Sequence, residues 1–179
     1  LNGLTWNNGI ISTGTGSSFI ITGNSGVINT NGAGASTGAT GGSPTLNGVM
    51  SVANGATLTI TPTGISAWTY LDFGTSASLT NNGTINFTPF SGGGWSYVDF
   101  RLTPAFTGTG ATGVFNNRGV VNIGPTTGAG DTLGYMVVYF RPTFNNIGGS
   151  ISTYANGYAQ NNSSYLYIYT PTGQTGSIG

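Results

Sequence analysis

Short apolar runs, each ended within a few residues by glycine, asparagine or proline, make up most of this 179-residue sequence. The chain contains 33 glycines, and no stretch of a dozen residues shows a helically spaced apolar stripe without such breakers. The runs alternate apolar and polar residues and have the length of β-strands. The clearest are 49–52, 57–61, 84–87, 120–123 and 165–169. The sequence therefore predicts an all-β fold.

An asparagine-rich turn followed by a short strand recurs along the chain. Its clearest copies are 6–12, 79–86, 115–122 and 144–151, and weaker copies are 23–29 and 46–50. Asparagine and glycine tolerate positive φ, so they turn the chain sharply. Asparagine side chains in stacked turns can also hydrogen-bond to one another. We therefore expect turns of this kind to stack.

A strand rich in aromatic residues also recurs, at 68–73, 95–101, 135–141 and 164–169. In its first two copies the closing phenylalanines, Phe73 and Phe100, stand 27 positions apart, and Phe140 follows 40 positions later. Units that recur every ~20 to 50 residues are typical of stacked coils, because one unit alone cannot bury its apolar face. The repeats therefore indicate a single all-β domain, 1–179, built by stacking, which is either a segment of a longer repeat protein or a filament subunit.

The segments 4–12, 53–60 and 79–86 read LTWNNGIIS, ANGATLTI and LTNNGTIN. They resemble the β-strand repeats of large bacterial surface proteins of the autotransporter and filamentous-adhesin type. The resemblance implies a right-handed parallel β-solenoid that works as a secreted adhesin or fibre. Irregular Gly-rich inserts at 31–43 and 107–113 interrupt the repeats. The alternative is an antiparallel β-sandwich or jelly roll of the pilin-like type, which has similar turn spacing.

Stacking the aromatic strands in register assigns each side chain to one of two faces, because side chains alternate along a strand. The predicted core contains Leu71, Phe73, Val98, Phe100, Val138, Phe140 and Ile168. The opposite face collects four of the six charged residues with a stripe of tyrosines. These candidate site residues are Tyr70, Asp72, Tyr97, Asp99, Arg101, Tyr139, Arg141, Tyr167 and Tyr169.

Three interpretations of this face remain open. In the first it is structural: Asp72 pairs with Arg101 and Asp99 with Arg141 as exposed ion pairs, and the tyrosines form a ladder. In the second, its rings and guanidinium groups bind a glycan or a neighbouring subunit. In the third, Asp72 and Asp99 cleave glycosides. We expect the arginines to lower the pKa of both carboxyl groups, which disfavours a protonated acid and hence an enzyme.

The charged residues set further limits. Six residues carry a formal charge, and lysine, glutamate, histidine and cysteine are absent. This removes imidazole, thiolate and amine chemistry and soft metal ligands, so we expect no catalytic residue, metal or cofactor. Zero formal net charge disfavours nucleic acid, and no apolar run reaches the ~20 residues of a membrane span. The Thr-x-Thr run at 57–61 has no repeat, so we do not expect ice binding.

The sequence as a whole predicts an extracellular, cell-surface structural or adhesive protein that assembles with other copies of itself into a filament or surface fibre. Near-zero net charge favours association. The strand at 165–169 is apolar on both faces and is expected to be buried on both sides. The alternatives are a carbohydrate-binding module that uses the tyrosine and tryptophan stripe, and a segment of a phage tail fibre.

Overall fold

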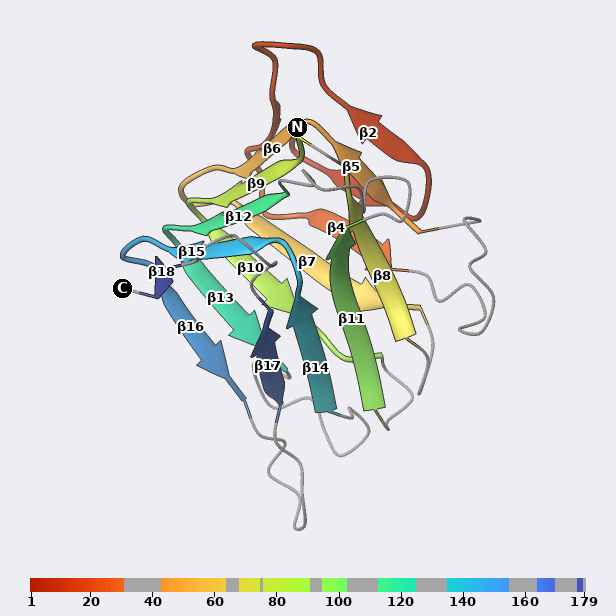
Figure 1. Ribbon diagram of the computed structural model, residues 1–179, viewed down its shortest axis with the longest axis vertical. Helices are drawn as coiled ribbons and strands as arrows, with labels where there is room; N and C mark the ends of the chain where they lie inside the picture. The colour runs from red at the N-terminus through yellow and green to blue at the C-terminus, as the bar shows by residue number, and fades with distance from the viewer. Residues whose placement is uncertain are drawn as a thin grey trace.

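The computed structural model describes residues 1–30, 43–63, 68–74, 76–90, 95–102, 113–124, 135–154, 164–169 and 177–178. These residues form β-strands joined by short turns and include no helix. The strands belong to three parallel sheets of six strands each, which enclose a common interior (Figure 1). The predicted inserts at 31–43 and 107–113, except for their last residues, lie outside the described residues.

Each of the three sheets takes every third strand of the chain. Sheet A contains β1 (Leu4–Trp6), β4 (Gly26–Thr30), β7 (Thr57–Pro62), β10 (Thr84–Phe87), β13 (Val120–Ile123) and β16 (Ser150–Thr153). Sheet B contains β2 (Ile10–Ser12), β5 (Thr45–Asn47), β8 (Trp68–Phe73), β11 (Trp95–Leu102), β14 (Tyr135–Phe140) and β17 (Tyr165–Ile168). Sheet C contains β3 (Phe19–Ile21), β6 (Val49–Val52), β9 (Ser78–Asn81), β12 (Val114–Asn117), β15 (Thr143–Asn146) and β18 (Ser177–Ile178).

Consecutive strands visit sheets A, B and C in turn, so each strand lies beside the strand three places before it. Each such turn of the chain is called a coil, and six coils stack from β1–β3 to β16–β18. Every strand pairing among the described residues is parallel. The predicted parallel β-solenoid is confirmed, and the antiparallel sandwich is wrong.

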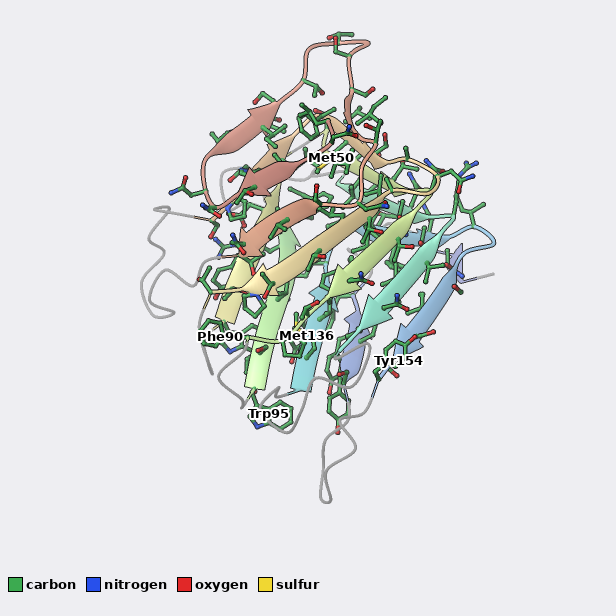
Figure 2. The ribbon with its side chains drawn as sticks, turned by 180° about the vertical axis from the view of Figure 1, so that it is seen from behind. Met50, Phe90, Trp95, Met136 and Tyr154 are labelled. Carbon is green, nitrogen blue, oxygen red and sulfur yellow. The ribbon has the colours of Figure 1, made fainter. Side chains whose placement is uncertain are left out.

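The interior of the solenoid is filled by one side-chain set from each sheet. In β7 the pattern alternates strictly between half-buried and buried residues, as expected for a strand with one face inside. Met50 and Met136, labelled in Figure 2, are both buried. Of the seven predicted core residues six are fully buried, and Ile168 is partly buried against the same cluster.

Stacked phenylalanines occupy the centre of the core. Phe100 lies on Phe140 with ring centroids 4.5 Å apart and ring planes 22° from parallel. Phe87 approaches Phe100 edge-on at 5.5 Å, and Phe115 stacks on Phe144 at 5.3 Å. Edge-on and offset contacts of this kind add stability beyond the burial of apolar area. Phe87, Phe115 and Phe144 were not among the predicted core residues.

The register between β8 and β11 differs from the 27-residue spacing of the closing phenylalanines. Phe100 pairs with Leu71, and Phe73 pairs with Leu102, so the shift along the chain is 29 residues and not 27. A shift of two residues leaves every side chain on its original face, because the side-chain period of a strand is two. The predicted core therefore holds, although the 27-residue spacing of Phe73 and Phe100 is not the register in which the two strands pair.

The asparagine turns form a buried ladder between sheets C and A. The Asn81 amide donates to Asn117 Oδ1 at 2.9 Å, and the Asn117 amide donates to Asn146 Oδ1 at 2.8 Å. This confirms the expected stacking for the copies at 79–86, 115–122 and 144–151. The copy at 6–12 instead joins β1 to β2, between sheets A and B, so it does not belong to the ladder.

Candidate functional site

The outer face of sheet B carries all nine predicted site residues. They project from β8, β11, β14 and β17 or, for Arg141 and Tyr169, from the positions directly after β14 and β17. Trp68, Trp95 and Tyr165 belong to the same face. We call these twelve residues the aromatic face. The four aromatic strands are thus neighbours in one sheet, as the repeat predicted.

Two ion pairs link neighbouring coils on this face, with the partners that the sequence predicted. The Arg101 guanidinium contacts both Asp72 oxygens, through Nε to Oδ1 and through Nη2 to Oδ2 at 3.2 Å. The Arg141 Nε donates to Oδ1 and Oδ2 of Asp99 at 2.8 and 2.9 Å. The carboxyl groups were expected to be exposed, but both aspartates are buried. The Arg101 guanidinium also lies over a ring, with its Cζ 3.8 Å from the Tyr70 ring centre.

Burial changes the electrostatics of the pair formed by Asp99 and Arg141. Removal from water raises the pKa of Asp99, and this effect outweighs the hydrogen bonds and charge of Arg141, which lower it. The hydrogen bond to Asp99 raises the pKa of Arg141, whose side chain is 45% exposed and loses less hydration. Arg141 and Arg101 do lower the pKa of Asp99, but the expectation that its pKa lies below the ordinary value is wrong, because burial has the larger effect.

The rings of the aromatic face stack on one another with their planes close to parallel. Tyr97 lies on Trp68 with centroids 5.0 Å apart and planes 17° from parallel. Tyr139 lies on Tyr167 at 4.9 Å and 11°. Parallel strands are ~4.8 Å apart, so rings that stand upright on successive coils meet face to face. Within the stack the ring faces cover each other, and mainly ring edges remain open to solvent.

The last strand of this sheet, β17, is not buried on both sides as predicted. Tyr165, Tyr167 and Tyr169 are all exposed, with Tyr167 at 43%. Their stacking partners lie in the preceding coils, for example Tyr139 under Tyr167. The prediction is wrong because a tyrosine is not purely apolar: its ring remains stable at a sheet edge with its hydroxyl group in water.

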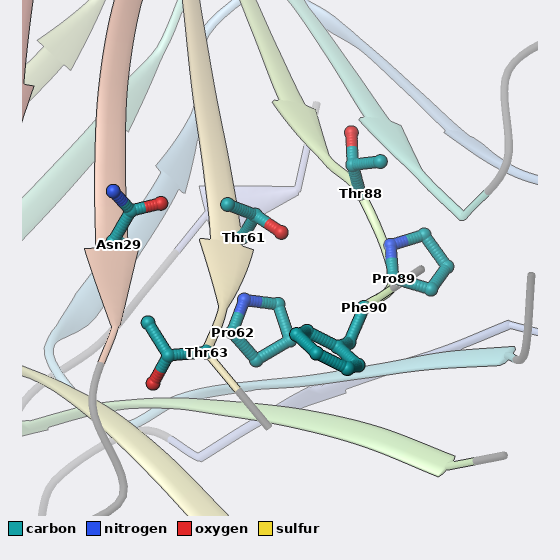
Figure 3. Close-up of a pocket in the computed structure, with 7 residues that line it drawn as sticks. All are labelled: Asn29, Thr61, Pro62, Thr63, Thr88, Pro89 and Phe90. Atoms are coloured by element: carbon teal, nitrogen blue, oxygen red, sulfur yellow. The ribbon is translucent and has the colours of Figure 1, made fainter. Parts of the chain in front are cut away.

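A groove opens on a different side, at the carboxyl ends of β4, β7 and β10 (Figure 3). Its volume is about 500 Å³. The residues that line it are Asn29, Thr61, Pro62, Thr63, Thr88, Pro89 and Phe90. None of these side chains is charged. They were not predicted as a site from the sequence, because they come from three segments far apart in the chain, each at or just beyond the end of a strand.

Two classes of site find no support in the described part of the chain. There, no group of three or more histidine, cysteine, aspartate or glutamate side chains is placed to hold a metal ion. The same residues include no helix long and apolar enough to cross a membrane. For glycoside cleavage, Asp72 and Asp99 would have to meet a substrate, and Asp99 is only 3% exposed and hydrogen-bonded to Arg141.

The coil topology and the ladders on its faces define the molecule as a parallel β-solenoid protein. Searches of protein-family models, curated proteins and solved structures found no match to the chain.

Proposed function

We propose that this chain is an extracellular structural subunit that assembles end to end into a filament or surface fibre, and that it is not an enzyme. The observation that carries the proposal is the chemistry of the two terminal coils. The first exposes apolar side chains and the last exposes tyrosine rings, in both cases beside strand edges that pair with no further strand among the described residues, and neither contains a charged residue. An edge of this kind pairs readily with another strand.

The first coil exposes apolar groups beside its open edge. Ile10, on β2, is 69% exposed, and Leu1 and Ile20 are also exposed. The other side of β2 pairs with β5, and in the described residues no strand covers its outer edge. Apolar side chains that remain in water next to free backbone donors and acceptors favour coverage by a further coil.

The last coil offers a complementary surface. Tyr165, Tyr167 and Tyr169 each stack on a ring of a preceding coil and remain exposed to solvent. One column of sheet B runs from Ile10 through Thr45, Asp72, Arg101 and Arg141 to Tyr169. Continuing that column across a junction places Tyr169 of one copy beside Ile10 of the next.

The distribution of charge supports the same proposal. All six charged residues lie between Asp72 and Arg141, in the middle coils or their connections. Proteins that avoid edge pairing often place charged side chains, above all lysine, on their edge strands. The first and last coils have no charged side chain, so no such side chain opposes pairing with a second copy.

The stiffening of the aromatic face supports a structural role over a catalytic one. Its rings are stacked, and its arginines are engaged with aspartates. The extracellular location is proposed on the resemblance of the repeats to bacterial surface proteins. The binding of glycan through this face, and a place in a phage tail fibre, remain alternatives.

The test compares assembly of the 179-residue chain with that of end variants, by electron microscopy and analytical ultracentrifugation. We expect filaments from the unchanged chain and folded monomers from Ile10→Lys and from Tyr169→Glu. A chain with both substitutions should recover filaments in part, because lysine meets glutamate at every junction. Val120→Lys, an exposed apolar site on sheet A, is the control and should leave filaments unchanged. An unchanged chain that stays monomeric at high concentration would refute the proposal.

A further inference from the structure

The groove at the ends of β4, β7 and β10 combines a row of polar groups with an apolar floor. Asn29, Thr61 and Thr88 come from three successive coils and form the row (Figure 3). Asn29 pairs with Thr61, and the Thr88 amide donates to the Ile60 carbonyl at 3.0 Å, which continues the register. Adjacent members of the row are thus ~4.8 Å apart along the solenoid axis.

The polar groups of the row remain open to a ligand. The Asn29 amide donates to Asn7 Oδ1 at 2.6 Å, which fixes the side chain and leaves its own Oδ1 as an acceptor. The hydroxyl groups of Thr61 and Thr88 make no hydrogen bond within the part of the chain that the structure describes. Each hydroxyl can donate one hydrogen bond and accept others. The row therefore presents donors and acceptors at a regular spacing.

The floor of the groove is made of rings. Pro62 and Pro89 are buried and rigid, and Phe90 is partly exposed, with its ring beside that of Pro62 in Figure 3. The Phe90 amide donates to Ser96 Oγ at 3.0 Å, which ties this position to β11. Unlike the rings of the aromatic face, Phe90 has no partner ring among the described aromatic contacts. Its ring can therefore receive a ligand.

We propose that this groove binds a neutral oligosaccharide that lies along the solenoid axis. A sugar ring has an apolar face of C–H groups, which fits Phe90 and the prolines, and a rim of hydroxyl groups, which fits the polar row. Ligand sites of similar volume combine a mostly apolar lining with a few placed polar groups in this way. Without a charged side chain, the groove offers nothing to compensate the charge of an acidic sugar or a phosphate.

The binding test uses neutral linear hexasaccharides of glucose, mannose and N-acetylglucosamine as probes, with hexagalacturonate as the acidic comparison. It is performed with the Ile10→Lys chain, so that assembly does not affect the result. If that chain still assembles, the Tyr169→Glu chain under dilute conditions serves instead. Threonine methyl signals report the site by NMR. We expect at least one neutral probe to shift the signals of Thr61, Thr63 and Thr88 while leaving Thr57, at the other end of β7, unchanged.

Substitutions then distinguish the contribution of the ring floor to binding from that of the polar row. Phe90→Ala should weaken binding by about tenfold or more, since it removes the stacking surface. Thr61→Val keeps the shape and removes one hydroxyl, so it should weaken binding about two- to tenfold. Tyr167→Ala, on the aromatic face, is the control and should leave affinity unchanged. Thermal unfolding confirms that each variant is folded.

Three results would each refute the proposal that this groove binds a neutral oligosaccharide. The first is that no neutral probe shifts the groove methyl signals at millimolar concentration. The second is that Tyr167→Ala, and not Phe90→Ala, abolishes binding. The third is that only hexagalacturonate binds. None of them bears on filament formation, which is measured separately, so the groove and the proposed function can fail independently.

Discussion

The Arg141 guanidinium and the Asp99 carboxylate form an ion pair that is buried at one end and open at the other. The Arg141 Nε lies 2.8 and 2.9 Å from the two carboxylate oxygens. Asp99 is 3% exposed, whereas the Arg141 side chain is 45% exposed. Loss of one partner therefore has unequal effects, because a stranded arginine can turn to water and a stranded aspartate cannot.

We expect Arg141→Gln to destabilise the fold by about 1–3 kcal/mol at pH 7, since it leaves a buried carboxylate without its charged donor. Asp99→Asn should change stability by less than about 1 kcal/mol, because asparagine keeps an acceptor for Arg141 and no charge is buried. Urea unfolding at pH 7 measures both. Equal losses from the two variants would contradict the asymmetry of the pair.

The direction of the Asp99 pKa shift determines how the stability of the fold depends on pH. Burial raises the pKa of Asp99 above its ordinary value of 3.8, so the folded state holds this proton more tightly than the unfolded state. The free energy of unfolding, relative to Asp99→Asn, should fall as the pH rises from about 3.8 through the raised pKa, and then level off. Urea unfolding between about pH 3 and 8 measures this difference. A difference that grows with pH would show a lowered pKa.

The asparagine ladder should be a major local source of stability. Asn117 is fully buried and hydrogen-bonds to Asn81, Asn146 and the Ser150 carbonyl. Asn117→Ala leaves buried polar groups without partners, so we expect a loss of about 2–3 kcal/mol in chemical unfolding. Asn116→Ala, one residue away on the half-buried outer side, is the matched control and should lose about 1 kcal/mol or less.

The tight turn at Gly119 should not accept a side chain. A Cβ atom there would collide with the carbonyl oxygen of Gly83 in the turn of the preceding coil. We therefore expect Gly119→Ala to lose about 2 kcal/mol or more in thermal or chemical unfolding, because backbone must move. Gly14→Ala, where an added Cβ meets nothing within 4 Å, is the control and should have an effect below about 1 kcal/mol.

Among these substitutions, we expect the largest loss of stability from one in the phenylalanine stack. Phe100 is fully buried and contacts Phe73, Phe87, Phe115 and Phe140. Phe100→Ala should destabilise by about 3–5 kcal/mol in urea unfolding. Tyr97→Ala, three residues before it on the outer face, should lose clearly less because its ring is half-exposed. Similar losses from both would mean that the outer stack contributes as much as the core.

Alternation along single strands is local information, and it was enough to assign the two faces of sheet B. It correctly placed Leu71, Val98 and Phe140 in the core and Tyr70, Asp72 and Arg101 on the outer face of the sheet, although Asp72 is buried there. It also brought the right charges together, since Asp72 with Arg101 and Asp99 with Arg141 are the pairs observed. The shortage of helix formers likewise determined the fold class.

Only the tertiary structure decided how the coils align. The two-residue offset between β8 and β11, and the exclusion of the turn at 6–12 from the asparagine ladder, depend on the lengths of connections and on packing across coils. The burial of Asp99, which raises its pKa, arises only when the coils pack together. The groove has the same origin: Asn29, Thr61 and Thr88 are about 30 residues apart in sequence and meet only because stacking repeats every coil at ~4.8 Å.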